Sequence, residues 1–260
     1  IEAQHCQKLL FGTSDAKAIT ISFHVRSKQT GTYALNLFLD DDTVQFTKTY
    51  TISSADTFEK KTITFPANTS AVIEDDTGKG IEFTWWLRAG STYTGGSAMS
   101  GYEAFSNGDY AVGQAVDFLD DAANEFYLTG VQVEIGEVAT PFKYETFAEN
   151  LARCQRYYQV FASGDNVPIT NASLYNTQFA FGFRPTYVPM RAAPTLVQLT
   201  GSNAYHFFNA NTNDTFDDFV LDQSFSTGVN LMNQDAVSGT QGDGGWFQSN
   251  SASGLVAVHS

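Results

Sequence analysis

Two stretches near the start of the chain place an apolar side chain at every second position. In Ile19–Val25 and in Tyr33–Leu39, every odd-numbered residue is apolar. Successive side chains of a β-strand point to opposite faces, so this period of two predicts strands with one buried face. A helix would need apolar residues at a spacing of 3.6, which these stretches lack. The chain is therefore expected to begin as antiparallel β-structure.

Further strands are predicted along the first half of the chain, at Val44–Ile52, Thr62–Phe65, Ile81–Leu87 and Tyr127–Ile135. In the last of these, one face is expected to carry Tyr127, Val131, Val133 and Ile135. Clusters rich in Gly, Asp, Ser and Thr separate the strands and supply turn conformations. Many short strands at this spacing indicate a β-sandwich or a jelly roll.

One segment has helical spacing instead. Thr146 and Glu149 form a capping-box pattern, and apolar or aromatic residues follow at 147, 151, 154 and 158. This pattern predicts a helix over residues 147–158 that connects two β-rich units, with the boundary near residue 145. Strands of the second unit are predicted at Gln178–Phe183, Thr195–Leu199, Tyr205–Asn209, Phe219–Leu221 and Gly254–Val258.

The predicted fold class is therefore all-β. We expect an N-terminal jelly-roll sandwich in residues 1–145, a connecting helix in residues 146–159 and a C-terminal β-sandwich domain in residues 160–260.

Charge and composition exclude several partners. The chain has 14 Lys and Arg against 28 Asp and Glu, a formal charge of −14, so binding to nucleic acid through phosphate neutralisation is not expected. No run of 18 apolar residues occurs, so membrane insertion is not expected either. Cys6 and Cys154 have no redox or metal spacing and are predicted to be free, mostly buried thiols.

Motifs for nucleophilic or metal catalysis are absent from the sequence, so we expect no enzyme. Two acidic clusters occupy predicted turns, and they consist of Asp40, Asp41 and Asp42 together with Glu74, Asp75 and Asp76. Solvated turns are the first interpretation of these clusters. A structural calcium site is the alternative, because Ca²⁺ takes several oxygen ligands from loops; no other cofactor is expected.

Aromatic residues are the stronger candidates for a binding site. Alternation predicts that Trp85 faces the core and Trp86 faces outward. Flat rings stack on the C–H faces of sugars, so a carbohydrate platform is predicted from Trp86, Tyr93, Tyr102, Phe105 and Tyr110. Packing against a neighbouring domain or subunit is the competing role for Trp86. In the second unit the candidates are Trp246 and Tyr205, with a hydrophobic plug as the alternative for Trp246.

Several motifs occur in an order that resembles a family of bacteriophage tail-fibre and minor structural proteins, especially those of marine phages. The central match is the strand, link and helix formed by Val131–Gly136, Ala139–Phe142, Leu151 and Cys154–Tyr158. Other matches are Ile1–Gln4, Phe11–Thr13, Thr20–Ser27, Thr49–Pro66, Gly90–Gly96 and Met190–Thr195. The chain departs from the family pattern with Phe11 in place of Trp and Lys143 in place of Glu.

The resemblance implies a carbohydrate-binding-module-like jelly roll followed by a β-rich tip domain, in a virion protein that is extracellular after release. It implies a homotrimer that contacts other virion proteins and binds host-surface polysaccharide. The helix is expected to pack at the three-fold axis or between domains, through Phe147, Leu151, Tyr157 and Tyr158. Two other functions stay open: a structural head-fibre or tail-adaptor component with spacer domains, and a polysaccharide depolymerase.

Overall fold

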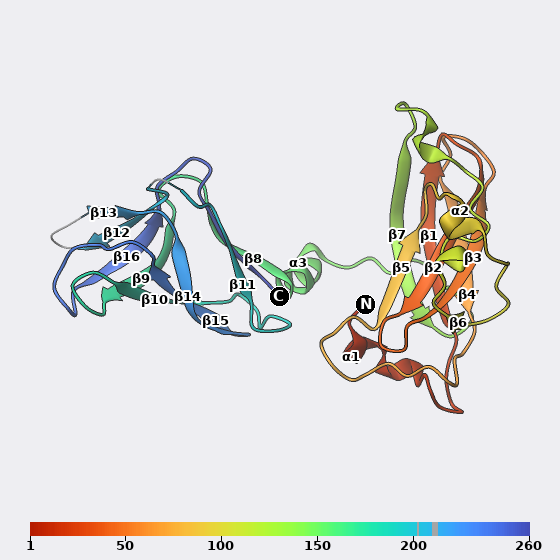
Figure 1. Ribbon diagram of the computed structural model, residues 1–260, viewed down its shortest axis with the longest axis horizontal. Helices are drawn as coiled ribbons and strands as arrows, with labels where there is room; N and C mark the ends of the chain where they lie inside the picture. The colour runs from red at the N-terminus through yellow and green to blue at the C-terminus, as the bar shows by residue number, and fades with distance from the viewer. Residues whose placement is uncertain (202, 210–212) are drawn as a thin grey trace. The chain divides into compact units, whose positions relative to one another are not determined.

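The computed structural model describes residues 1–201, 203–209 and 213–260. The protein is all-β, as predicted, and divides into two compact units, Ile1–Tyr144 (unit 1) and Glu145–Ser260 (unit 2). Figure 1 shows unit 1 from red to green along the chain and unit 2 from green to blue. Each unit has a hydrophobic core of its own.

Unit 1 is a β-sandwich of two antiparallel sheets with strand orders β4-β1-β7 and β5-β2-β3-β6 (Figure 1). The strands are β1 (Ile19–Ser27), β2 (Gly31–Leu39), β3 (Val44–Ile52), β4 (Glu59–Phe65), β5 (Ile81–Trp85), β6 (Glu103–Ala104) and β7 (Phe126–Ile135). The short helices are α1 (Ala3–Cys6), η1 (Gln7–Leu9), α2 (Ser91–Thr94), η2 (Asn107–Asp109) and η3 (Phe118–Asp120). The seven strands are one short of the eight of a jelly roll, so that finer prediction is not confirmed.

The core of unit 1 lies between its two sheets. The odd-numbered residues of Ile19–Val25 and Tyr33–Leu39 are all buried in it, which confirms the alternation of β1 and β2. Trp85 also faces this core, with its ring 5.6 Å from that of Phe23. Apolar burial of this extent is the main source of stability in a sandwich of this size.

Strand β7 contains a bulge that the sequence pattern did not reveal. Tyr127 pairs with Arg26 and Val133 pairs with the buried Ile21, while the register between β1 and β7 shifts in between. Gly130 lies in the shifted stretch with a φ of 59°, a left-handed conformation that glycine adopts readily. The extra residue moves Tyr127 to the outer face, so the prediction that Tyr127 shares a face with Val133 is wrong.

Unit 2 consists of a seven-stranded sheet, β13-β12-β16-β9-β10-β15-β14, and a three-stranded sheet, β11-β17-β8 (Figure 1). The strands are β8 (Tyr158–Ser163), β9 (Pro168–Leu174), β10 (Ala180–Pro185), β11 (Thr195–Gln198), β12 (Tyr205–Asn209), β13 (Asn213–Phe216), β14 (Phe219–Phe225), β15 (Gly228–Asn233), β16 (Gly244–Ser249) and β17 (Leu255–His259). Phe207 and Phe247 of the larger sheet share one core with Val256 and Val258 of the smaller sheet. The two sheets therefore enclose a single hydrophobic core.

The predicted helix is present as α3 (Phe147–Gln155), with the capping box between Thr146 and Glu149. It is three residues shorter than expected, because Tyr158 already begins β8 and pairs with His259 of β17. Tyr157 and Tyr158 thus lie beyond the helix. Among the described residues α3 is the longest helix, and none there is long and apolar enough to span a membrane.

Both cysteines are free, as predicted. Cys6 is buried, and desolvation raises the pKa of its thiol to about 11. Cys154 is exposed on α3, so the prediction that both thiols are mostly buried is wrong for that residue.

Candidate functional site

Four of the five aromatic residues proposed for a platform in unit 1 come together. The ring of Trp86 lies 5.3 Å from that of Tyr93 and 5.1 Å from that of Tyr110. Phe105 extends the group, 5.4 Å from Tyr110. The contacts are tilted or edge-to-face, the geometry in which aromatic rings pack against each other. Trp86 therefore lies on the side of its sheet opposite Trp85, as alternation predicted.

This aromatic group belongs to a layer that covers the outer face of the four-stranded sheet. Residues 105–112, with α2 packed on them, lie against the polar side chains of that face: Gln45 donates to the carbonyl of Ser106 at 2.8 Å, and Thr47 donates to that of Asp109 at 2.7 Å. Gln45 and Thr47 are buried as a result. Contacts with Tyr93 and Tyr110 cover much of the Trp86 ring, which favours the packing role for this residue.

Tyr102 does not join the group. Its ring packs edge-on against Phe11 at 6.0 Å and Phe46 at 5.4 Å, on the core side of the sandwich. Burial there raises the pKa of the Tyr102 hydroxyl. The predicted role of Tyr102 in a sugar platform is wrong, because the ring points away from the other four.

In unit 2 the outer face of the seven-stranded sheet carries an open row of side chains. Trp246 of β16 pairs with Phe208 of β12 on one side and with Asn171 of β9 on the other. Trp246 is 43% exposed, and its ring is stacked on Phe208 at a centroid distance of 5.2 Å and an angle of 12°. Phe183 of β10 follows and is also exposed. We call these four residues the Trp246 surface.

A groove of about 610 Å³ runs beside Trp246. It is lined by Pro168, Ile169, Thr170, Asn171, Phe183, Arg184, Pro185 and Trp246. Arg184 is its only charged lining residue, and its guanidinium lies over the rings of Phe161 and Tyr187 and donates to the Tyr187 hydroxyl. Among the described residues the Asn171 amide has no hydrogen-bond partner, so a donor and an acceptor are available next to an open aromatic ring.

Tyr205 was predicted as a companion of Trp246 but is fully buried. Its ring packs 4.6 Å from Phe219, and its hydroxyl lies 2.8 Å from the carbonyl oxygen of Leu199 and 3.0 Å from that of Leu255. Burial raises the pKa of Tyr205 to about 12. The binding role is wrong because alternation along β12 turns Tyr205 inward and Phe208 outward.

Three carboxylates of the acidic turns accept hydrogen bonds from backbone amides. Asp42 accepts from the amide of Val72 at 2.7 Å, Asp41 from that of Glu74 at 3.0 Å, and Asp76 from that of Gly78 at 2.7 Å. Asp40 pairs with Lys79 at 3.0 Å. Asp75 is exposed, between Glu74 and Asp76 in the second of the two acidic segments. Within the described ranges no three Asp, Glu, His or Cys residues are placed to hold a metal ion.

The residues proposed for an oligomer interface all present apolar surface. Phe147 is 82% exposed, and Leu151, Tyr157 and Tyr158 are each exposed by more than a third. No residue of α3 is buried. Helix α3 thus has an amphipathic sequence, and its apolar Phe147 and Leu151 are both exposed.

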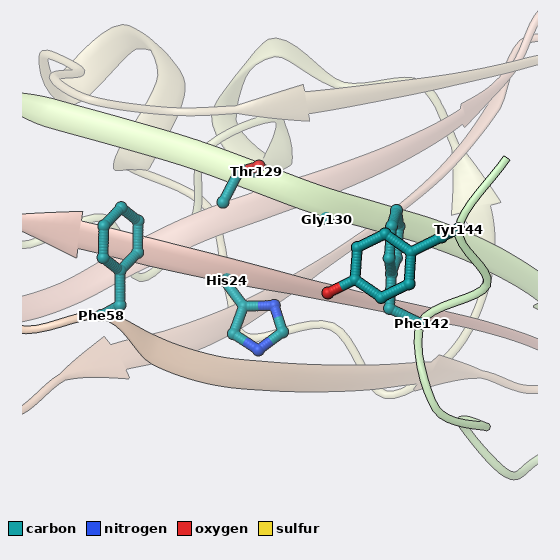
Figure 2. A pocket seen from close by; sticks show the side chains of 6 residues that line it. All are labelled: His24, Phe58, Thr129, Gly130, Phe142 and Tyr144. Carbon is teal, nitrogen blue, oxygen red and sulfur yellow. The ribbon is translucent and has the colours of Figure 1, made fainter. Parts of the chain in front are cut away.

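A pocket of about 310 Å³ lies on the outer face of the three-stranded sheet of unit 1 (Figure 2). It is lined by His24, Phe58, Thr129, Gly130, Phe142 and Tyr144, and we call it the His24 pocket. Figure 2 shows Phe58 at one end and Phe142 with Tyr144 at the other, with His24 and Gly130 between them. The sandwich face that carries the pocket is thus partly roofed by residues that follow β7.

No family model matches the chain, and no curated protein and no solved structure shows significant similarity to it.

The residues of the His24 pocket were not predicted from the sequence. Two signals in the sequence point to it: His24 lies at an outward position between the inward Phe23 and Val25, and Gly130 interrupts a strand, which often marks a bulge. In unit 2, Phe208 and Asn171 were missed for a different reason. Their contribution depends on strand pairing across β12, β16 and β9, which no local pattern predicts.

Proposed function

We propose that the protein is a non-enzymatic virion fibre component that holds a host-surface glycan on the Trp246 surface. The observation that carries the proposal is the exposed Trp246 ring, which borders a groove beside the unpartnered amide of Asn171. An aromatic face and a neighbouring amide are the two elements that bind a sugar: the ring covers the C–H face and the amide bonds the hydroxyls.

The charge pattern favours a neutral glycan. The guanidinium of Arg184 is already engaged by two aromatic rings, and the remaining lining residues of the groove carry no charge. The whole chain has a formal charge of −14, which repels polyanions. A neutral polysaccharide therefore matches the Trp246 surface better than an acidic one.

A homotrimer built on α3 is the second part of the proposal. An isolated helix of nine residues is only marginally stable, and the apolar Phe147 and Leu151 lie four positions apart on one face. Packing of three copies would cover these side chains and place three weak glycan sites on one particle, which raises the overall avidity. Other virion proteins would bind elsewhere on this assembly.

The test of the glycan site compares Trp246→Ala with Phe225→Ala in the full chain. Phe225 is 50% exposed on β14 of the same sheet and is the matched control. Retention on an array of neutral bacterial polysaccharides is expected to weaken about tenfold or more in Trp246→Ala, the loss of roughly 1.4 kcal/mol, and to stay unchanged in Phe225→Ala.

Equal retention by both variants and the unchanged chain would contradict the site and favour the spacer function. The release of new reducing ends from the same polysaccharides would instead favour a depolymerase. The trimer is tested separately: Phe147→Asp is expected to shift the mass measured by light scattering from three chains to one. A wild-type mass of one chain would contradict that part of the proposal.

A further inference from the structure

The His24 pocket has the composition of a small-ligand site. Three aromatic side chains and one imidazole line it, and none of its lining residues is an acid, a lysine or an arginine. Its volume of about 310 Å³ is at the lower end of the range for ligand sites, roughly 300 to 1,000 Å³. A ligand of one ring, or two small rings, is the size that fits.

Polar groups of the pocket are available to a ligand. Within the part of the chain that the structure describes, the His24 imidazole, the Thr129 hydroxyl and the Tyr144 hydroxyl have no hydrogen-bond partner. Together they provide both hydrogen-bond donors and hydrogen-bond acceptors to a ligand. A neutral ligand with several hydroxyls uses such groups better than an anion or a cation does.

The arrangement of the rings favours a neutral polyhydroxyl ligand over a quaternary ammonium cation. A quaternary ammonium group needs aromatic faces on several sides at close range. Figure 2 shows Phe58 separated from Phe142 and Tyr144, with His24 between the two ends. An open trough of this form suits a polyhydroxyl ring whose C–H groups contact one aromatic group at each end.

The wall formed by Phe142 and Tyr144 is held in place before any ligand binds. These residues belong to residues 136–144, which we call the return segment. Gln132 of β7 accepts from the amide of Lys143 at 2.8 Å, and Glu134 accepts from the amide of Thr140 at 2.9 Å. The Phe142 and Tyr144 rings then pack edge-on at 5.1 Å. Such preorganisation lowers the entropy cost of binding.

The bulge at Gly130 makes room for this wall. A Cβ atom on Gly130 would lie 3.1 Å from His24 Nδ1 and 3.7 Å from a ring carbon of Phe142. The φ of 59° would in addition strain most other residues. Glycine at this position therefore lets both rings approach the strand and keeps the floor of the pocket open.

We propose that the His24 pocket binds a single neutral pyranose ring, held between Phe58 and the Phe142–Tyr144 wall and hydrogen-bonded by His24 and Thr129. This site is separate from the Trp246 surface and does not depend on it. A bound sugar would contact both the sheet and the return segment, so it would also hold the return segment against the sheet.

The experiment uses the full chain with Trp246→Ala, which removes the other proposed sugar site. The probes are the methyl glycosides of glucose, galactose, mannose and N-acetylglucosamine, observed by saturation-transfer NMR and titration. At least one is expected to bind with a roughly millimolar Kd, as small ligands of this size do. Removal of one stacking ring is expected to weaken binding about 3- to 10-fold, in Phe58→Ala and in Tyr144→Ala.

The matched control is Val138→Ala, because Val138 is 75% exposed in the same return segment and does not line the pocket. It is expected to bind like the parent. Phe58 and Tyr144 are themselves exposed, so neither variant should unfold, and circular dichroism checks this.

Trypsin provides a second measurement. Cleavage after the exposed Lys143 is expected to slow severalfold with the bound glycoside, while cleavage after the exposed Arg88 is unchanged. No binding by any of the four glycosides, or equal binding by Phe58→Ala and Val138→Ala, would overturn the proposal. Loss of binding in the Trp246→Ala background alone, with binding in the unchanged chain, would assign the sugar to the Trp246 surface instead.

Discussion

Two tryptophans lie on outer sheet faces, Trp86 in unit 1 and Trp246 in unit 2, and they differ in how far other residues cover their rings. Residues 91–112 cover the face that carries Trp86, and Tyr93 and Tyr110 pack on its ring. Among the described residues no such layer covers Trp246, which contacts Phe208 and borders a groove. An outward aromatic residue is therefore accessible to a ligand only where the chain leaves the sheet uncovered.

The largest effect is expected from Trp86→Ala. Removal of a ring that fills a covered layer should lower the free energy of unfolding of unit 1 by about 3 kcal/mol, because a cavity is left under residues 91–112. Urea unfolding measures this through the fluorescence of Trp85, in a Trp246→Phe background that leaves Trp85 as the one remaining tryptophan. A change below about 1 kcal/mol would contradict the packing role and remove the contrast with Trp246.

The buried hydroxyl of Tyr205 gives the next effect. Tyr205→Phe removes the donor that serves the Leu199 and Leu255 carbonyls and should cost about 1 to 2 kcal/mol in unit 2. Hydrogen exchange of the slowest amides of β12 and β17 reports the change. Unaltered exchange would show that the hydrogen bonds of the Tyr205 hydroxyl contribute little to the stability of unit 2.

Trp246→Ala is expected to change the stability of unit 2 by less than about 1 kcal/mol, since the side chain is 43% exposed and lies on the outer face of its sheet. The same exchange measurement applies, with Phe225→Ala beside it. A loss as large as that of Trp86→Ala would mean that Trp246 is a hydrophobic plug, and the two tryptophans would then be alike.

The smallest effect concerns the return segment, which covers its sheet only in part. A hydrogen bond from Thr140 lowers the pKa of Glu134 below its usual value. A carboxylate with a lowered pKa stabilises the folded form above its unfolded pKa, near 4, and this contribution is lost as the pH falls through the folded value. Protection of the Thr140 amide, corrected for intrinsic exchange, should therefore decrease below about pH 4.

Glu134→Gln should show reduced protection of the Thr140 amide already at pH 7, with amides of β3 as the internal control. Constant protection across this range in the unchanged chain would show that Glu134 does not hold the return segment.

Strand positions were predictable from the sequence wherever one face is uniformly apolar, as in β1 and β2. In β12 the sequence Tyr205–Phe208 is aromatic at all four positions, so alternation alone does not tell which side is the core. For the bulge the sequence offers only a glycine inside a strand, and the face on which each side chain then lies was not predictable, because it depends on the register with the partner strand. The cover over Trp86 comes from residues 91–112, which have no periodic pattern.

The row from Phe208 through Trp246 to Asn171 consists of directly paired residues on three neighbouring strands. Each has a neighbour in sequence that points to the other face and belongs to the core. The outward positions can thus be exchanged while the inward ones, such as Phe247, keep the unit folded. We expect natural variants of this protein to change their preferred ligand by substitution at these positions, without insertions or deletions in the strands. The backbone would then serve as a constant frame for rapid diversification.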